Sequence, residues 1–431
     1  MKTVILPSKD KWEALCKRPA IIKSELEDVV RNIINDVKSL GDQALLDYAE
    51  KFDKMKTTTL KVSPEEIAGS AGQVSEELKA AIDIARRNIE KFHSAQLYIE
   101  PIIETSPGVK CRRKNVAIEK VGLYVPGGSA PLFSTVLMLG IPAKIAGCKE
   151  IVICTPPDKD GNANPLILYT AGLLGIKDIF KTGGAQAIAA MAYGTDTIPK
   201  VYKIFGPGNQ YVTKAKELIQ QDGISIDLPA GPSEVLIIAD KTANPEFIAA
   251  DLLSQAEHGS DSQVIFLADN RELIKQTGRE LEKQLKKIPR NEIASKALDN
   301  SLFILLDSLD DCIDFSNQYA PEHLIINTAD FSSVSDMIIN AGSVFLGKYS
   351  CESAGDYASG TNHTLPTSGY ARSYSGVSTD SFVKKISFQE LSSQGIENIG
   401  PAIALMAEAE LLQAHKNAVT VRLKYLENVR N

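Results

Sequence analysis

The histidine side chains are the residues of this chain best suited to acid–base and metal chemistry. Imidazole changes its charge near neutral pH and is a common ligand of divalent metals. The chain has only five histidines. His93 lies in a helical stretch with no other metal-type side chain nearby, and we assign it no role. His258, His323, His363 and His415 each stand beside carboxylates, amides or glycines, so these four positions define the segments in which we search for a site.

The first of these segments, SQAEHG at 254–259, closes a helix that we expect to begin near Asn244. Residues i and i+3 of a helix project from one face, so Gln255 and His258 can reach a single point. Polar pairs at this spacing are also common on exposed helix faces. An ordinary polar helix end is therefore the alternative interpretation.

The second segment, PEHLII at 321–326, places Glu322 and His323 at the entrance to an apolar strand. Ligands bind at strand mouths in α/β sheets, and a carboxylate next to an imidazole offers two general bases of different basicity. Consecutive strand residues point to opposite faces, so both side chains reach one substrate only if the strand has not yet begun. A catalytic pair and a surface turn both remain open.

The third segment, SAGDYASGTNH at 353–363, is rich in small residues. Such loops let the backbone approach a ligand closely, and Asp356 is a hard oxygen ligand available to zinc. A flexible surface loop has the same composition and is the alternative.

The fourth histidine lies in a helix-rich tail together with Glu410. Glu410 and His415 are five residues apart, which separates them by about 140° around a continuous helix. They can share a site only if the helix is broken or if they approach the site from different sides.

Two glycine-rich turns are candidates for a nucleotide site. Gly183-Gly184-Ala185-Gln186 and Gly206-Pro207-Gly208-Asn209 each follow a predicted strand, where nucleotide phosphates usually bind. Neither turn is a GxGxxG fingerprint, because Tyr211 occupies the place of the third glycine in the second. The pattern alone favours tight structural turns.

The elements that must position these residues form two series of short apolar runs, separated by helical segments. The first hundred residues and the tail after about residue 380 are expected to be helical instead. Runs of this length between helices are typical of parallel sheets covered on both faces, so we predict two α/β units. The predicted strands are 121–125, 151–154, 178–180 and 203–205 in the first series, and 235–239, 264–268, 302–306, 323–326 and 344–346 in the second.

The composition excludes several classes of protein. A chain of 431 residues with 44% hydrophobic residues can bury a large core in two or three domains. A net charge of −7 without a long run of one sign argues against a nucleic-acid partner. No apolar run resembles a secretory signal or approaches the ~20 residues that cross a bilayer, so we expect a cytoplasmic protein. Six cysteines without a CxxC pair are interpreted as reduced core thiols.

Taken in order, eight segments resemble the histidinol dehydrogenase family over essentially the whole chain. Eight blocks in one order are far more specific than any single block. They are VGLYVPGGSAPL at 121–132, GGAQAIAA at 183–190, KIFGPGN at 203–209, DLPAGPSEVL at 227–236, LLSQAEHG at 252–259, APEHL at 320–324, ESAGDYASGTNH at 352–363 and AHKNAV at 414–419.

The resemblance implies a role for most of the residues singled out above. Glu322 and His323 correspond to the catalytic pair. The implied zinc ligands are Gln255, His258, Asp356 and His415. The implied substrate contacts are Ser233, Gln255, His258, His323, Asp356, His363, Glu410 and His415, and the implied NAD contacts are Tyr124, Gln186 and Asn209.

The resemblance also implies an intertwined homodimer, in which a small C-terminal domain reaches the active site of the partner subunit. In that arrangement Glu410 and His415 would both enter a site built mostly by the other subunit, which would explain their spacing of five residues. We expect two Rossmann-like domains with incomplete parallel sheets and small helical extensions at both ends. The expected division is an N-terminal extension at 1–22, a first α/β domain at 23–121 and 234–378 with the catalytic and zinc residues, a second at 122–233 with the NAD contacts, and a C-terminal helical domain at 379–431.

The implied reaction is a zinc-dependent, NAD-linked oxidation of L-histidinol to L-histidine through L-histidinaldehyde, the last steps of histidine biosynthesis. Zinc would hold the amino and imidazole nitrogens of the substrate, His323 would accept the alcohol proton, and Glu322 would help water to add to the aldehyde.

Three alternatives remain. One is a paralogue that oxidises another small hydroxymethyl alcohol, although His363 and Glu410 suit a cationic amine and an imidazole. Another is a hydrolase in which zinc activates water and Glu322 is the general base. The third is a binding protein with an architectural metal, for which an amide ligand and a histidine from another subunit would make a poor zinc site.

Overall fold

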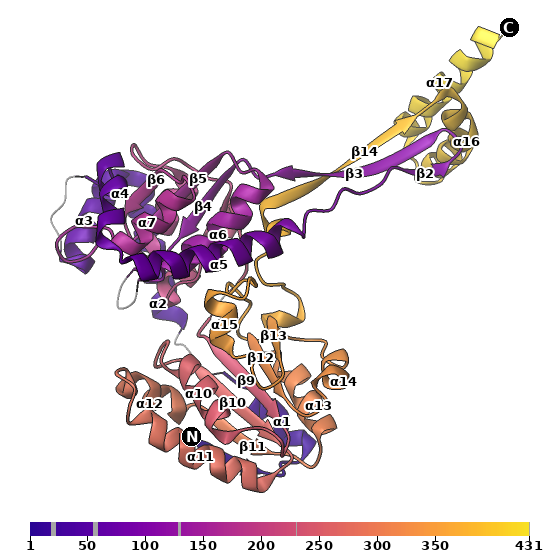
Figure 1. The fold of residues 1–431 in the computed structure, drawn as a ribbon. Helices are drawn as coiled ribbons and strands as arrows, with labels where there is room; N and C mark the ends of the chain where they lie inside the picture. Colours follow the sequence, from indigo (N-terminus) through magenta and orange to yellow (C-terminus); the bar gives the residue numbers. More distant parts are fainter. Residues whose placement is uncertain (19–22, 55–58, 128–130, 230, 431) are drawn as a thin grey trace. The chain divides into compact units, whose positions relative to one another are not determined.

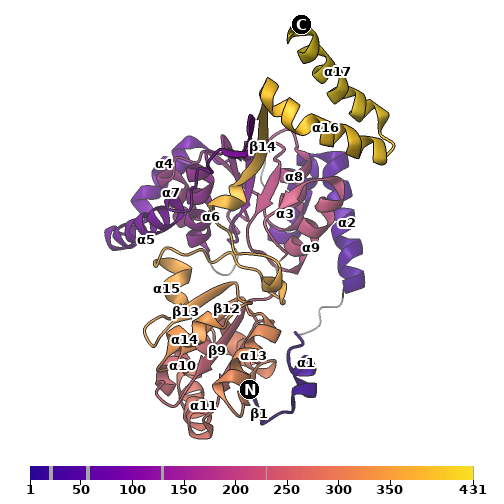
Figure 2. The same cartoon turned by 90° about the vertical axis from the view of Figure 1, so that its right-hand side faces the viewer.

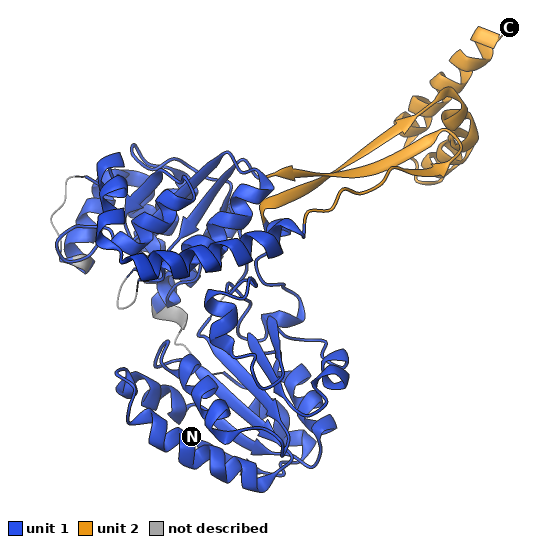
Figure 3. Cartoon of the chain, viewed as in Figure 1, with its two compact units in different colours: residues 1–96, 118–381 blue, residues 97–117, 382–431 orange. Residues whose placement is uncertain are grey.

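The computed structural model describes residues 1–18, 23–54, 59–127, 131–229 and 231–430, and these form two compact units. The first unit comprises residues 1–96 and 118–381, and the second comprises residues 97–117 and 382–431 (Figure 3). No described helix is long and apolar enough to cross a membrane.

A six-stranded parallel sheet forms one part of the first unit (Figure 1). Its strand order is β1-β11-β10-β9-β12-β13. The strands are β1 (Lys2–Ile5), β9 (Glu234–Ala239), β10 (Gln263–Ala268), β11 (Leu302–Leu305), β12 (His323–Asn327) and β13 (Ser343–Leu346).

Both faces of this sheet are covered, because alternate strand residues enter two different cores. On β9, Val235 and Ile237 pack with one group of helices, whereas Leu236 and Ile238 pack with the other. The first group is α10 (Pro245–Ala256), α11 (Arg271–Leu285) and α12 (Asn291–Asp299). The second is α1 (Trp12–Leu15), α13 (Leu309–Tyr319) and α14 (Phe331–Asp336). Burial on both faces explains why these strands are continuous apolar runs in the sequence.

A five-stranded parallel sheet forms the other part of the first unit, with the order β6-β5-β4-β7-β8. The strands are β4 (Lys120–Tyr124), β5 (Glu150–Thr155), β6 (Asp178–Lys181), β7 (Lys203–Phe205) and β8 (Ser225–Ile226). Figure 2 shows one set of helices on each side of this sheet. One set is α4 (Pro64–Ser70), α5 (Glu76–Ser94), α6 (Phe133–Ala146) and α7 (Pro165–Leu173), and the other is α2 (Lys23–Leu40), α3 (Asp42–Asp53), α8 (Gly184–Tyr193) and α9 (Gln210–Ile219).

The prediction of two parallel α/β units is confirmed, and every predicted strand is present. From β4 in the smaller sheet and from β9 in the larger one, the chain first adds strands on one side and then crosses to the other side, whereas β1 joins the far edge of the larger sheet beside β11. The strand order therefore reverses between β4 and β7 in the smaller sheet and between β9 and β12 in the larger one. Such switch points are where side chains and turns from separate segments meet.

The second unit corrects the prediction that no strands follow residue 380. Strand β14 (Val383–Leu391) pairs antiparallel with β3 (Val109–Ala117), which pairs with β2 (Ile103–Ser106). Two helices, α16 (Ser393–Ala409) and α17 (Gln413–Arg430), complete the unit. Almost all of β14 is exposed and it carries charged residues, so it lacks the apolar run that marked the buried strands.

The predicted domain boundaries differ from the observed packing in three places. Lys2–Ile5, predicted within an N-terminal extension, is the edge strand β1 of the larger sheet, and residues 19–22 of that extension lie outside the described residues. Helix α2, predicted in the first α/β domain, packs on α8 and α9 of the smaller sheet. Residues 97–117, predicted in the same domain, belong to the second unit.

The cysteines also differ in part from their prediction as core thiols. All six are free, and Cys16, Cys154 and Cys312 are buried as predicted. Cys351, however, is exposed.

Candidate metal and acid–base site

The Glu322-His323 pair lies where β12 begins, and its geometry meets the condition set by the sequence. The strand starts at His323, so Glu322 lies before it and its side chain need not point to the opposite face of the sheet. His323 Nδ1 lies 3.5 Å from Glu322 Oε2, and both side chains are buried. The pair is at the amino end of the strand, whereas ligand sites of parallel sheets usually lie outside the carboxyl ends.

The backbone of Glu234 orients both members of the pair. Its N–H donates to Glu322 Oε2 at 2.8 Å, and its carbonyl oxygen lies 3.1 Å from His323 Nδ1. A carbonyl can only accept, so Nδ1 carries the proton and donates. The other ring nitrogen, Nε2, lies 3.5 Å from Asp356 Oδ1 and has no hydrogen-bond partner among the described residues. In the neutral tautomer, Nε2 is thus the nitrogen available to accept a proton.

A cluster of metal-type ligands adjoins this pair. One ligand atom each from His258, Glu352 and Asp356 lies within 4.8 Å of the others. Gln255, in the last turn of α10, joins the cluster through a 3.2 Å contact from its Nε2 to His258 Nδ1. Its Oε1 is fully buried and has no partner among the described groups. Imidazole nitrogen with carboxylate and amide oxygens is a donor set that suits a divalent cation, and the unpartnered oxygens fit that role.

Glu352 is a member of the cluster that the sequence analysis missed. It lies in α15 (Glu352–Tyr357), four residues before Asp356. Residues at i and i+4 share one helix face, so the spacing was a usable signal once a helix was expected there. The prediction of a loop at 353–363 is wrong for its first five residues, which lie in α15.

Burial and mutual interaction shift the pKa of each group in the cluster. Desolvation raises the pKa of Glu322 and raises that of Glu352 well above its usual range. Desolvation opposes the charged form of His323, but the Glu322 and Asp356 carboxylates outweigh it and raise the pKa of the imidazole. For Asp356, desolvation is again outweighed by the neighbouring His323, and the pKa is lowered. Desolvation lowers the pKa of His258, which favours the neutral imidazole that a metal ligand requires.

The other two predicted substrate contacts of the first unit lie beside this cluster. His363 Nδ1 is 3.1 Å from the backbone oxygen of Asp356, and its Nε2 is 3.3 Å from Thr135 Oγ1 on α6. Both ring nitrogens are thus engaged within the chain. Ser233 directly precedes β9 and is adjacent to Glu234, whose backbone orients the acid–base pair.

A buried ion pair that the sequence analysis missed fixes the start of β9. Arg18 Nε and Nη2 lie 2.9 and 3.0 Å from the two carboxylate oxygens of Glu234, and the backbone N–H of Ser368 donates to the same carboxylate at 2.8 Å. Glu234 is 1% exposed, so its charge requires these partners. The pair anchors the backbone groups that hold Glu322 and His323. The available signal in the sequence was the single charged residue at the start of the buried apolar run Glu234–Ala239, because a buried charge requires a partner.

The predicted NAD contacts gather at the switch point of the smaller sheet. Tyr124 ends β4, and its hydroxyl accepts a hydrogen bond from the Gly184 N–H at 3.1 Å. Gln186 lies in the first turn of α8 and is buried. Asn209 caps α9, and its Oδ1 accepts from two backbone N–H groups of the first turn. The carboxyl ends of β4, β6 and β7 therefore bring the three residues to one edge, as expected for a nucleotide site in an open parallel sheet.

Gly206 shapes this edge, and its replacement is expected to destabilise the chain. Its φ is +126°, and an added Cβ would lie 2.1 Å from the Tyr124 carbonyl oxygen. Gly206→Ala should lower the free energy of unfolding by about 1–3 kcal/mol through backbone strain and overlap, measured by urea denaturation. Gly223→Ala is the matched control, because Gly223 has φ +84° but no atom within 4 Å of an added Cβ. An equal loss in both variants would show that the overlap with Tyr124 contributes nothing.

Glu410 and His415 belong to the second unit. Helix α16 ends at Ala409, Glu410 is its C-cap, and Leu411 has φ +61° before α17 begins at Gln413. The helix is therefore broken between Glu410 and His415, which is one of the two arrangements that would let them share a site. Both residues are exposed.

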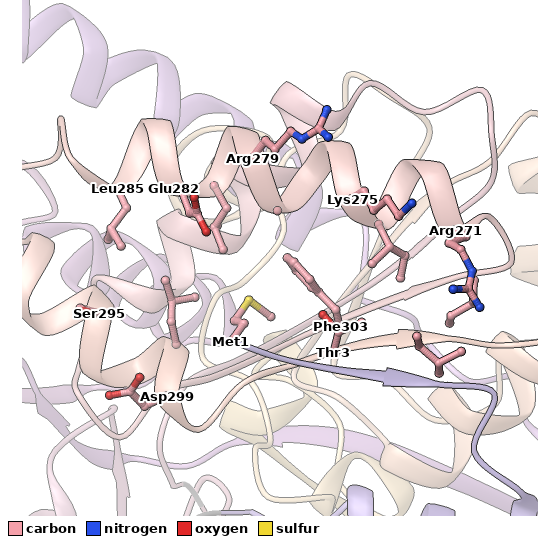
Figure 4. Close-up of a pocket in the computed structure, with 16 residues that line it drawn as sticks. Met1, Thr3, Arg271, Lys275, Arg279, Glu282, Leu285, Ser295, Asp299 and Phe303 are labelled. Carbon is pink, nitrogen blue, oxygen red and sulfur yellow. The ribbon is translucent and has the colours of Figure 1, made fainter.

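A pocket of about 480 Å³ lies elsewhere in the first unit, between α11, α12 and the β1–β11 edge of the larger sheet (Figure 4). Its floor is apolar, with Phe303 among the lining residues, and Arg271, Lys275 and Arg279 line it from α11. None of the candidate site residues lines it.

Together these features define a doubly wound α/β protein with a buried cluster of titratable and metal-type side chains at one sheet and helix N-termini at the carboxyl edge of the other. The histidinol dehydrogenase family model matches residues 16–423. Histidinol dehydrogenase of Bacteroides thetaiotaomicron is 59% identical over 427 residues, covering 99% of this chain and 100% of the relative. The relative from Escherichia coli K12 is 52% identical, covering 96% and 95%. This chain belongs to the histidinol dehydrogenase family, and it is an oxidoreductase of that family.

A solved structure supports the fold at the same level. The crystal structure of histidinol dehydrogenase from Elizabethkingia anophelis superposes with a TM-score of 0.97. It is 59% identical in sequence, and the match covers 99% of both chains.

Proposed function

We propose that this protein oxidises L-histidinol to L-histidine through L-histidinaldehyde, using zinc and two molecules of NAD. Family membership supports the substrate and the oxidation. The observation that carries the chemistry is the buried Glu322-His323 pair, whose Nε2 has no hydrogen-bond partner among the described residues and lies 3.5 Å from Asp356 Oδ1 in the cluster of metal-type ligands. Such a base can take the proton of a substrate hydroxyl that is held beside it.

For the metal, we propose Gln255, His258 and Asp356 of one subunit together with His415 of the partner subunit. The buried, unpartnered Oε1 of Gln255 supports a ligand role, because an amide oxygen without a partner is costly in the interior. When bound, zinc would fix the amino and imidazole nitrogens of the substrate and so place its hydroxymethyl carbon.

The acid–base steps follow from the geometry of the pair. His323 accepts the hydroxyl proton on Nε2 while a hydride passes from the carbinol carbon to NAD, which yields the aldehyde and NADH. Glu322 then takes a proton from a water that adds to the aldehyde carbon. The hydrate loses a second hydride to a second NAD, and the carboxylate of L-histidine forms. The protons leave through His323 and Glu322, whose positions the Glu234 backbone fixes.

Ser233, His363 and Glu410 are proposed as substrate contacts, and Tyr124, Gln186 and Asn209 as NAD contacts. His363 already bonds at both ring nitrogens, so a direct substrate contact requires it to exchange Asp356 or Thr135 for the ligand. The position of the NAD candidates at the switch point supports their assignment.

We further propose an intertwined homodimer. In this arrangement the second unit, with Glu410 and His415, completes the site of the neighbouring subunit. The break between α16 and α17 supports this proposal, because it frees both side chains from a single helix.

The function is tested by incubating zinc-loaded protein with L-histidinol and NAD, then quantifying NADH and L-histidine. We expect a ratio of about two NADH per L-histidine, as a four-electron oxidation requires. Histidine without NADH would favour another acceptor, and no histidine would defeat the proposal. Turnover of other amino alcohols in place of L-histidinol would instead favour the paralogue interpretation, and hydrolysis without NAD would favour a hydrolase.

A further inference from the structure

The pocket between α11, α12 and the β1–β11 edge is left without a role by the proposed function (Figure 4). Its volume of about 480 Å³ lies within the range of sites that hold small organic molecules, roughly 300–1,000 Å³. Both helices and both strands contribute apolar side chains to its lining, which include Ile5, Ile274, Leu298, Phe303 and Leu305. Such a lining stabilises the apolar part of a ligand by removing it from water.

Three cationic side chains line the pocket from α11, and none of them forms an ion pair with a residue that the structure describes. They are Arg271, Lys275 and Arg279. They follow one another at intervals of four residues, so like charges are neighbours on the helix surface and repel. Two acidic residues of the same helix are engaged elsewhere, because Glu280 pairs with Lys283 at 3.1 Å and Glu272 accepts from Gln276 at 3.2 Å. An anion in the pocket would compensate the three charges.

The acidic side chains of the lining lie at the other end of the pocket. Glu282 is in the last turn of α11 and Asp299 is the last residue of α12, on the side away from Arg271 (Figure 4). Arg271 begins α11, about 16 Å from Glu282 along the helix axis. The amino end of the helix, where Arg271 lies, itself favours negative charge. A ligand with one anionic group is therefore oriented with that group at the start of α11.

Gly278 leaves room beside the ring of Phe303, and the backbone does not require a glycine there. It lies in the middle of α11, and its φ is not positive. An added Cβ would lie 3.4 Å from Phe303 Cε2, which is an ordinary contact distance. Glycine in the interior of a helix is destabilising relative to alanine, because it loses more conformational freedom on folding. The missing side chain thus keeps the pocket open at the expense of helix stability.

We propose that this pocket binds a small amphipathic anion, which has a short acyl chain or an aromatic ring as its apolar body and a single carboxylate. The apolar body packs against Phe303 beside Gly278, and the carboxylate pairs with Arg271 and Lys275. None of the proposed metal, substrate or NAD contacts lines the pocket. The inference therefore does not depend on the proposed oxidation.

The test is isothermal titration calorimetry with octanoate and the full-length, zinc-loaded protein. Octanoate has a short acyl chain and one carboxylate, whereas octanamide has the same chain and a neutral amide. We expect one octanoate to bind per chain. Octanamide should bind at least about tenfold more weakly, because it lacks the charge that strengthens hydrogen bonds to the cations.

Two variants place the binding in this pocket, and a third is their matched control. Arg271→Gln/Lys275→Gln removes the proposed partners of the carboxylate, and Gly278→Leu fills the space beside Phe303. Each should weaken octanoate binding by at least about tenfold. Lys283→Gln should leave the binding unchanged, because Lys283 is an exposed cation of the same helix that does not line the pocket.

The expected pattern can fail in three ways, each of which would overturn the inference. The first is no detectable binding of octanoate to the parent protein at millimolar concentrations. The second is equal affinity for octanoate and octanamide, which would leave the cations without a ligand. The third is equal octanoate affinity in the parent and in Arg271→Gln/Lys275→Gln, which would place the binding elsewhere. Thermal melting checks that each variant folds, and the charge variant decides the question if Gly278→Leu does not.

Discussion

Replacing His323 with asparagine is expected to lower kcat for L-histidinol oxidation by about 10²- to 10⁴-fold, the contribution typical of a general base. The amide of asparagine can still donate to the Glu234 carbonyl oxygen, which lies 3.1 Å from Nδ1 in the native ring. It offers no basic nitrogen where Nε2 faces Asp356. The expected loss is thus chemical, and KM should change much less. Steady-state kinetics with saturating NAD measure both parameters.

The control for this variant is its zinc content, which should match that of the parent because His323 is outside the proposed ligand set. The melting temperature should also stay close to that of the parent. Glu322→Gln should instead slow the oxidation of added L-histidinaldehyde more than that of L-histidinol, since Glu322 is proposed to act on water. Activity of His323→Asn within about tenfold of the parent would remove His323 from the acid–base role.

Two inactive variants are expected to restore activity when they share a dimer. His415→Ala removes the ligand proposed to come from the partner subunit, and His323→Asn removes the base of the other unit. A heterodimer of the two then has one site with both defects and one site with neither. Random mixing gives about half heterodimers, and about half of the sites should be intact once purification through both tags has removed the homodimers. The measurement is activity after co-expression of the two variants with different affinity tags and purification through both tags.

The double variant His323→Asn/His415→Ala, mixed with native subunits, is the matched control for this experiment. Its heterodimers contain two damaged sites, one lacking His323 and one lacking His415, and should be inactive. An inactive heterodimer of the two single variants would contradict the shared site, because each subunit would then use its own His415. The metal content of the isolated His415→Ala protein gives a second readout, since it should bind zinc more weakly than the parent.

Most of the parallel architecture could be predicted because both sheets are buried on both faces. Gln263–Ala268, for example, is buried at every position. A short apolar run of this kind, flanked by two helical segments, is typical of a buried parallel strand. Strand β14 could not be predicted in the same way. Its neighbours are one antiparallel strand and solvent, so Lys384, Lys385 and Glu390 are tolerated and the apolar pattern is absent.

The parts of the candidate site formed by residues adjacent in sequence could be predicted. The contacts between residues far apart in sequence could not. Glu322 and His323 are neighbours in sequence, and the only uncertainty was where the strand begins. Arg18 and Glu234 are 216 residues apart, so their ion pair is visible only after folding. Glu352 looks like an ordinary acidic residue near the start of a short helix. Only the burial of its side chain and its approach to His258 and Asp356 set it apart.

The repeated strand order of the two sheets has an electrostatic consequence. The candidate residues of the smaller sheet lie at its carboxyl edge, where α8 and α9 begin and present their N–H groups. The cluster of the larger sheet lies at the opposite, amino edge, where α10 ends and presents its carbonyl groups. Helix macrodipoles favour negative charge at the first kind of end and positive charge at the second. One topology, used from its two opposite edges, thus provides one region where positive helix ends gather and another where a negative helix end lies.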